Sequence, residues 1–172
     1  NNTWWINYCF FSDMERNRDR RPLLYHRWGG LGNHRYQVGF SGDAIISWKS
    51  LDYQPYFTAT ASNVLYGYWS HDIGGHISMG AGIVPEMYAR WLQFGAYSPV
   101  MRTHSSKDGR LNKEPWVFDD EYRDVIRATI IRRYEMVPYI YTMARKAHDE
   151  GLSLCRPLYY DCLLYTSDAA DD

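Results

Sequence analysis

The chain has 172 residues, of which 45% are hydrophobic and 23% charged; this globular composition excludes a disordered chain, a collagen and a coiled coil. Its 19 Lys and Arg against 20 Asp and Glu give a net charge of -1, which argues against a nucleic-acid partner because phosphates favour a clustered basic surface. No apolar run approaches the roughly 20 residues that a membrane span needs. Aromatic residues, at 17%, suit sugar faces, stacked bases and cores alike.

Short apolar runs that end in polar or glycine-rich clusters predict four strands. Proline and glycine separate these runs from their neighbours, and each run has the length of a buried strand. The four strands are expected within 23–27, 38–43, 66–73 and 99–104.

The remaining regular structure is predicted to be helical. Residues 48–61 have helical length, and a helix over 85–94 would begin with a proline, which suits a first turn. Pro138 should break the next helix, and a further helix should continue to about Glu150 with Gly151 as its cap. The helix before the break is strongly amphipathic, because apolar residues step by four at Tyr122, Ile126, Ile130 and Tyr134.

The last eleven residues, CLLYTSDAADD, differ abruptly from the chain before them. They have no periodic pattern and resemble a translated sequencing adapter, so we exclude them from the fold. Because the chain also begins without Met, we expect a fragment: a domain over 1–161, followed by a non-native tail over 162–172. Cellular localisation is left open.

The three cysteines, Cys9, Cys155 and Cys162, are odd in number and widely spaced. They have neither the density of a disulfide framework nor the spacing of a metal site. The sequence predicts buried free thiols.

Strands that alternate with helices imply parallel βαβ units. Each predicted strand ends in polar side chains, and the chemistry of a (β/α)8 barrel lies at the carboxyl ends of its strands. Four such endings in series favour a barrel over a doubly wound sheet. Because a whole barrel takes about 250 residues, we expect an α/β fold that is a partial (β/α)8 TIM barrel. It would be roughly the second half, with the N-terminal half of its own barrel missing.

Asp43 is the best candidate for a catalytic acid or base. It follows Gly42 at a strand end, with Phe40 and Trp48 close in sequence as an apolar wall. The alternative is structural, because Asp is a favoured N-cap and a helix is predicted to follow.

Asp72 lies in a second polar strand end, between His71 and His76. A metal site is the weaker interpretation, because these two histidines are five residues apart and share neither a helix face nor a strand face. The other interpretation is a carboxylate that accepts hydrogen bonds from paired hydroxyls, as a sugar site requires. Arg102 and His104 alternate on a strand and could point into one site, or could simply be solvated.

Four blocks of the sequence resemble the retaining α-glycosidases of glycoside hydrolase family 31. Asp43 follows Arg27 by 16 positions and precedes Asp72 by 29. The order and spacing of the blocks make the resemblance highly specific, and it extends from about Trp4 to Asp161. The blocks are RPLLYHRWGGLGNHRYQVGFSGD, YGYWSHDIGGH, RWLQFGAYSPVMRTHS and KEPWVF.

The resemblance implies a role for each matching residue. Asp43 resembles the general acid/base. Phe40 stands where relatives often have Trp, and His76 stands where some have Phe. These two differences leave the outer walls of the pocket and the choice of sugar open. The residues that resemble sugar contacts or pocket wall are Arg27, Phe40, Trp69, Asp72, His76, Arg102 and His104.

The family's nucleophile, an Asp in a Trp-x-Asp strand end, has no counterpart here. Trp4 and Trp5 are followed by Asn7, and relatives of this type have a helix at this point, so we expect a helix over 4–17. Asp13 would lie in that helix or at its end, which makes it a poor nucleophile.

The resemblance implies a fragment of a retaining α-glucosidase that acts on α-linked oligosaccharides by double displacement, without cofactor or metal. The fragment itself would be inactive, because the nucleophile is missing. Two alternatives stay open. One is another sugar-processing barrel, such as an α-xylosidase, an α-galactosidase-like enzyme or a transglucosylase. The other is a non-catalytic carbohydrate-binding module, which the aromatic content would suit.

Overall fold

The computed structural model describes residues 2–17, 19–27, 30–80 and 82–162. The tail predicted over 162–172 therefore lies, apart from Cys162, outside the described residues. Within those ranges, none of the helices combines the length and the apolar character that a membrane span requires.

Three short parallel strands form the centre of the fold, in the order β1-β2-β3. They are Tyr25–His26 (β1), Val38–Phe40 (β2) and Tyr68–Ser70 (β3). Tyr25 pairs with Val38, and Val38 with Tyr68. The helix α2 (Trp48–Thr60) connects β2 to β3, which confirms the predicted βαβ unit. Parallel pairing requires such a crossover.

Residues 99–104 do not form the predicted fourth strand. Only Val100 makes a bridge, parallel to Ser70. Pro99 has no N–H for a ladder, and side chains capture the nearby carbonyl groups. Arg133 donates to the oxygens of Ala96, Ser98 and Pro99 at 2.9, 2.6 and 3.0 Å. Residues 99–104 therefore lie beside the end of β3 without adding a strand to the sheet.

The helices agree closely with the sequence predictions. They are α1 (Asn2–Asn17), α2, α3 (Pro85–Tyr97), α4 (Asp120–Glu135) and α5 (Val137–Glu150). The break between α4 and α5 falls at Met136, and Pro138 lies in the first turn of α5, where a missing N–H costs nothing. Gly151 ends α5 with a φ of 73°, the left-handed conformation that glycine adopts most easily.

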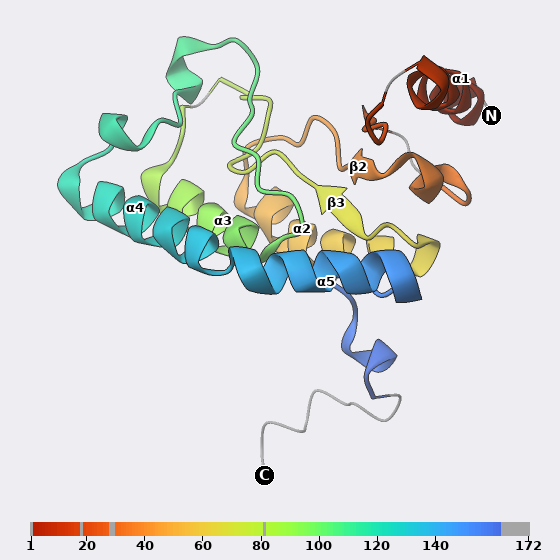
Figure 1. Cartoon of the computed structure of the whole chain (residues 1–172). Coiled ribbons are helices and arrows are strands. Elements are labelled where there is room, and N and C mark those ends of the chain that lie inside the picture. Colours follow the sequence, from red (N-terminus) through yellow and green to blue (C-terminus); the bar gives the residue numbers. More distant parts are fainter. Residues whose placement is uncertain (1, 18, 28–29, 81, 163–172) are drawn as a thin grey trace.

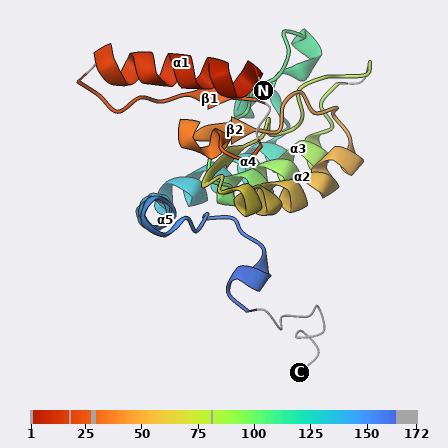
Figure 2. The same ribbon diagram turned by 90° about the vertical axis from the view of Figure 1, so that its right-hand side faces the viewer.

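The helices lie on two sides of the strands. In both views α2 and α3 lie across the strand layer from α1 (Figure 1, Figure 2). The main core fills the space between the strand ends, α3 and α4, and Tyr88 stacks on Phe118 with ring centroids 5.1 Å apart. Ile73, the third residue after β3, belongs to this core, so it anchors the loop that carries Asp72. The buried members are Ile73, Met87, Tyr88, Trp91, Leu92, Phe118 and Ile126.

The cysteines are free, as predicted, but none of the three is fully buried. Cys9 and Cys162 are exposed, and Cys155 is half-buried, with its Sγ 3.4 Å from the carbonyl oxygen of Tyr97. The prediction of buried thiols is wrong for Cys9 because α1 buries only Asn7 among its residues.

Candidate active site

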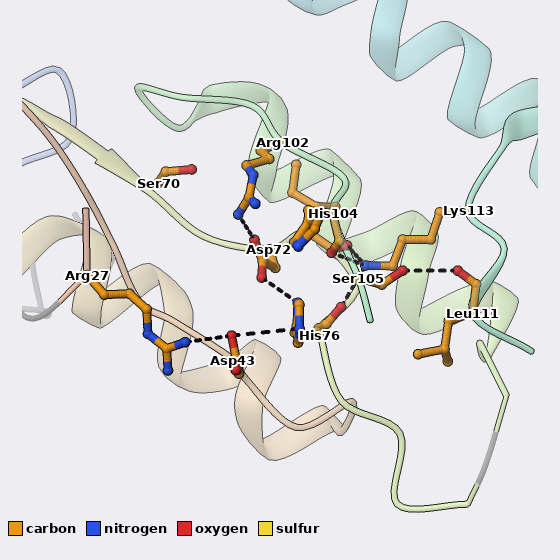
Figure 3. Close-up of polar contacts among 12 residues, drawn as sticks. Arg27, Asp43, Ser70, Asp72, His76, Arg102, His104, Ser105, Leu111 and Lys113 are labelled. Carbon is orange, nitrogen blue, oxygen red and sulfur yellow. Dashed lines mark hydrogen bonds and ion pairs between the residues drawn. The ribbon is translucent and has the colours of Figure 1, made fainter. Parts of the chain in front are cut away.

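The ends of the three strands bring distant polar side chains together. Arg27 follows β1, Asp43 follows β2 and Asp72 follows β3. The carboxyl ends of parallel strands meet at one edge of a sheet, so these side chains lie close in space although 45 positions separate the first from the last. Figure 3 shows them pointing toward one another, with His76, Arg102 and His104 beside them.

Asp43 is held from two sides and is partly open to solvent. Nη1 of Arg27 donates to its Oδ1 at 3.0 Å, and both side chains are 35% exposed. Nε2 of His76 lies 3.7 Å from the same oxygen. A Cβ on Gly42, whose φ is +82°, would lie 3.1 Å from the Arg27 guanidinium, so glycine allows this close approach.

Asp43 does not cap the helix that follows it. The N-cap of α2 is Ser47, whose hydroxyl accepts from the backbone N–H of Ser50 at 3.1 Å. The structural alternative considered for Asp43 is therefore wrong, and its carboxylate is turned toward Arg27.

Asp72 is fully buried, and ion pairs compensate its burial. Nη1 of Arg102 donates to its Oδ1, and Nδ1 of His76 lies 3.0 Å from its Oδ2. Burial raises the pKa of Asp72, against the opposing effect of the positive groups Arg102, His76, His104 and Lys113. A buried carboxylate with fixed partners is a preorganised acceptor.

Arg102 is fixed by aromatic rings as well as by Asp72. Its guanidinium carbon lies 4.9 Å from the ring centroid of Tyr25 and 5.3 Å from that of Phe40. The Tyr25 hydroxyl accepts from Nη1 of Arg102 at 3.2 Å and donates to Ser70 Oγ at 3.0 Å. Phe40 therefore lies in the cluster, as a wall beneath two guanidinium groups, since Arg27 also lies 5.8 Å above its ring.

The rings of His76 and His104 lie 5.0 Å apart, and burial lowers the pKa of His104. Together with Asp72 they offer three possible metal ligands whose atoms lie within 4.8 Å of one another. Of the two histidines considered from the sequence, His76 belongs to this group, whereas His71 is fully buried against Phe94 and Trp91. The charges of Arg102 and Lys113 next to Asp72 disfavour a divalent cation there.

The structure does not bring Trp69 into this cluster, contrary to expectation. Trp69 is 4% exposed and belongs to a second apolar cluster with Ala61 and Tyr66. Its ring packs 5.1 Å from those of Phe57 and Tyr66. Neighbouring residues of a strand point to opposite faces, so Ser70 and not Trp69 contacts the cluster residue Tyr25. Trp69 helps to line a separate apolar cavity of about 240 Å³.

The sequence predictions missed two residues of the cluster. Tyr25 was treated only as part of an apolar run, although its hydroxyl joins Arg102 to Ser70. Lys113 was part of the KEPWVF block without a role, yet its ammonium is buried beside Asp72. Nothing in the apolar run indicated a role for Tyr25. For Lys113, the only indication was that it belongs to the KEPWVF block.

Comparison with known proteins supports a barrel-related α/β fold for this domain and identifies its family. The model of the glycosyl hydrolases family 31 TIM-barrel domain matches residues 3–143. The chain therefore belongs to glycosyl hydrolase family 31.

Curated relatives include an α-glucosidase and an α-xylosidase. Neutral alpha-glucosidase AB of Mus musculus is 33% identical over 140 residues, which cover 81% of this chain and 14% of the relative. The alpha-xylosidase of Saccharolobus solfataricus is 30% identical over 154 residues, which cover 88% of this chain and 21% of the relative. The chain thus spans only a small part of the relatives it matches.

Solved structures agree with the sequence relatives. A mutant of the Flavobacterium johnsoniae family 31 dextranase in complex with isomaltotriose superposes with a TM-score of 0.81 at 32% identity, over 91% of this chain and 20% of the dextranase. An α-xylosidase from a soil metagenome, complexed with xylose, has a TM-score of 0.82 at 22% identity over 93% of this chain and 27% of the xylosidase. The second likeness concerns the fold alone.

Proposed function

We propose that this chain is the second half of the (β/α)8 barrel of a retaining α-glycosidase that hydrolyses α-glucosidic bonds of oligosaccharides. One observation carries the proposal: Asp43, Arg27, Asp72 and Arg102 converge at the carboxyl ends of parallel strands. That edge is where barrel enzymes hold their active sites. Family membership supports the reaction class.

In this proposal Asp43 is the general acid and then the general base. It donates a proton to the departing glycosidic oxygen, and later accepts one from the water that releases the sugar. Its partly exposed carboxyl group suits contact with a substrate, in contrast to the buried Asp72. Arg27 and His76 hold one of its oxygens in place.

The remaining residues would form the pocket for the sugar whose bond is cleaved. Arg27, Arg102, His76 and His104 would contact hydroxyl oxygens of the sugar, and the buried Asp72, expected from the sequence to be a sugar contact, would hold Arg102 and His76 in place for it. Phe40 would supply an apolar wall. A fixed array of this kind is matched to ring hydroxyls because its own hydrogen bonds prevent the groups from turning away.

Double displacement also needs a nucleophilic carboxylate about 5–5.5 Å from the acid. Asp72 is an unsuitable nucleophile because it is fully buried and held by Arg102. Asp13 lies in α1, where the side chain of Asn17 donates to it at 2.7 Å. We therefore propose that the nucleophile comes from a preceding barrel strand and that the 172-residue chain alone is inactive. The proposed mechanism uses no cofactor and no metal.

A chimaera tests the proposal. Residues 3–143 would replace the matching segment of the Flavobacterium johnsoniae dextranase, which would supply the rest of the barrel. We expect hydrolysis of an α-glucoside by the chimaera. The variant Asp43→Asn should lower kcat at least about 100-fold, the usual minimum for a lost general acid.

Two controls make the result decisive. Asp119→Asn, which changes an acidic residue away from the cluster, should leave kcat unchanged. The isolated chain should show no turnover of nitrophenyl α-glucoside. A folded chimaera that keeps its full activity with Asp43→Asn would overturn the role of Asp43. Unchanged sugar binding by a chimaera that never hydrolyses the substrate would favour a carbohydrate-binding module.

An α-xylosidase is the second candidate, because one curated relative carries that activity. Xylose lacks the hydroxymethyl group of glucose, so pocket depth decides between the two sugars. The same chimaera, assayed on nitrophenyl α-glucoside and α-xyloside with and without an acceptor sugar, separates glucosidase, xylosidase and transglucosylase activity.

A further inference from the structure

Lys113 is a buried cation that lies beside the candidate active site. Lys113 is only 7% exposed. It lies two residues before the short helix η4 (Pro115–Val117). Nζ donates to the carbonyl oxygens of Ile73, Gly75 and His104 at 2.6, 2.6 and 2.9 Å. An ammonium group has three hydrogens, so every one of them has a fixed acceptor.

The three acceptors belong to the two segments that carry the site. Ile73 and Gly75 lie between Asp72 and His76, and the third acceptor is the backbone of His104 itself. Figure 3 shows the Lys113 ammonium group next to His104 and Ser105, on the side of Asp72 that faces away from Arg27. One ammonium therefore fixes the backbone between Asp72 and His76 and at His104.

The position of Lys113 is itself fixed by the main core. The hydroxyl of Tyr88, a core residue that is 2% exposed, donates to the carbonyl oxygen of Lys113 at 3.0 Å. A Cβ on Gly74 would lie 2.7 Å from the Tyr88 ring and 3.2 Å from Lys113 Cε. The loop from Asp72 to His76, here called the site loop, therefore packs closely onto Tyr88 and Lys113, and only glycine fits at the point of contact.

We propose that Lys113 is a positioning residue of the sugar pocket, which holds Asp72, His76 and His104 in register and places a positive charge beside Asp72 without touching the substrate. The proposal rests on the function proposed above for the cluster. A lysine with every donor used within the fold has none left for a ligand, so its effect on a sugar is indirect.

Electrostatics agree with this geometry. Burial lowers the pKa of Lys113 to about 8, while the negative charge of Asp72 opposes the decrease. The ammonium is therefore still charged at neutral pH. The groups that lower the pKa of Asp72 are Arg102, His76, His104 and Lys113.

The test is an NMR titration of the full 172-residue chain and its Lys113→Met variant, which keeps the buried volume and removes the charge and the donors. We expect the pKa of the Asp72 carboxyl to rise, because a positive neighbour is lost. Mere loosening of the loop would admit water and lower that pKa toward its ordinary value. The direction of the change therefore separates positioning from general structural support. An unchanged or lowered pKa would overturn the proposal.

Amide exchange supplies a second readout on the same samples. The N–H of Ile73 donates to Arg102 O, and that of Ser106 to His76 O, so both report on the junction of the two segments. In Lys113→Met we expect both amides to exchange at least tenfold faster, with the amides of α4 unchanged. Lys113→Arg, which keeps the charge, should restore the pKa of Asp72. Equal acceleration in α4 would count against the proposal.

If Lys113→Met does not fold, the NMR titration of the unmodified chain tests the proposal. The Asp72 carboxyl and Gly75 carbonyl signals should shift together as the pH passes through the pKa of Lys113, and their failure to shift would overturn the proposal. None of these readouts needs catalysis. Should the chimaera show no role for Asp43 while Asp72 responds to Lys113 as expected, the proposed function fails and the link from Lys113 to the cluster remains.

Discussion

The strand-end cluster and the outer helix α5 use the same chemical groups with different consequences. Asp72 is fully buried where it pairs with Arg102, whose side chain is 29% exposed, whereas Asp149 pairs with Arg145 on α5 at 2.6 Å with side chains 42% and 71% exposed. Water can replace the partner of an exposed charge but not that of a buried one. Burial therefore gives the cluster its fixed geometry, and a short distance alone does not.

Replacing each aspartate with Asn tests this contrast most strongly. Asp72→Asn leaves Arg102 without its buried partner, and we expect the free energy of unfolding to fall by about 3 kcal/mol. Asp149→Asn on α5 should produce no measurable change. Urea unfolding of the two variants measures the difference, and equal effects would show that burial does not distinguish the two regions.

Apolar residues on opposite faces of α4 extend the comparison to packing. Ile126 is fully buried in the main core, while Ile131 is 42% exposed. Ile126→Ala should cost about 3 kcal/mol, because it leaves a cavity against α3. Ile131→Ala should change stability by less than about 0.5 kcal/mol. Thermal and urea unfolding check both values, and a large loss in Ile131→Ala would indicate that this face is covered.

The pH dependence of stability tests the buried polar residues. Burial lowers the pKa of His71 from 6.5 to about 4, so the unfolded chain binds a proton more readily between these values. Stability is then fully present above pH 6.5 and is lost as the pH falls toward 4. His71 should account for a loss of about 2 kcal/mol between pH 7 and pH 5. His71→Phe should flatten this part of the curve, and an unaltered slope would contradict the assignment.

Two glycines with left-handed backbones give the smallest contrast. A Cβ on Gly75, in the site loop, would lie 3.0 Å from the backbone of Ile46, whereas one on Gly80 would meet nothing within 4 Å. Both alanine variants carry about 1 kcal/mol of backbone strain. Gly75→Ala adds a steric clash and should cost about 1 kcal/mol more than Gly80→Ala. Urea unfolding measures this difference; equal losses would mean that the site loop can move aside.

The sequence predicted the parts of the site that depend on local pattern. A polar residue after a short apolar run marks a strand end, and parallel strands gather their ends at one edge, so Arg27, Asp43 and Asp72 could be expected to meet. The helices followed from apolar spacing and from Pro138 and Gly151. These signals are local, and packing does not overrule them.

The errors arose where distant residues decide the outcome. The expected strand over 99–104 makes one bridge, at Val100, and its first carbonyl group, that of Pro99, accepts from Arg133 on another element. Trp69 and Ser70 are neighbours, and a shift of one residue exchanges the faces of a strand, so the sequence could not say which of them faces the cluster. A buried Lys113 has no local signal, because its acceptors lie on two other segments.

The most direct test of the central claim uses the dextranase chimaera and glucosides whose leaving groups differ in acidity. A lost general acid matters most when the leaving group is a poor one. We predict that Asp43→Ala lowers kcat/KM at least 100-fold for a disaccharide and far less for a dinitrophenyl glucoside, which needs no proton to depart. An equal loss on both substrates would contradict the assignment of Asp43 as the proton donor.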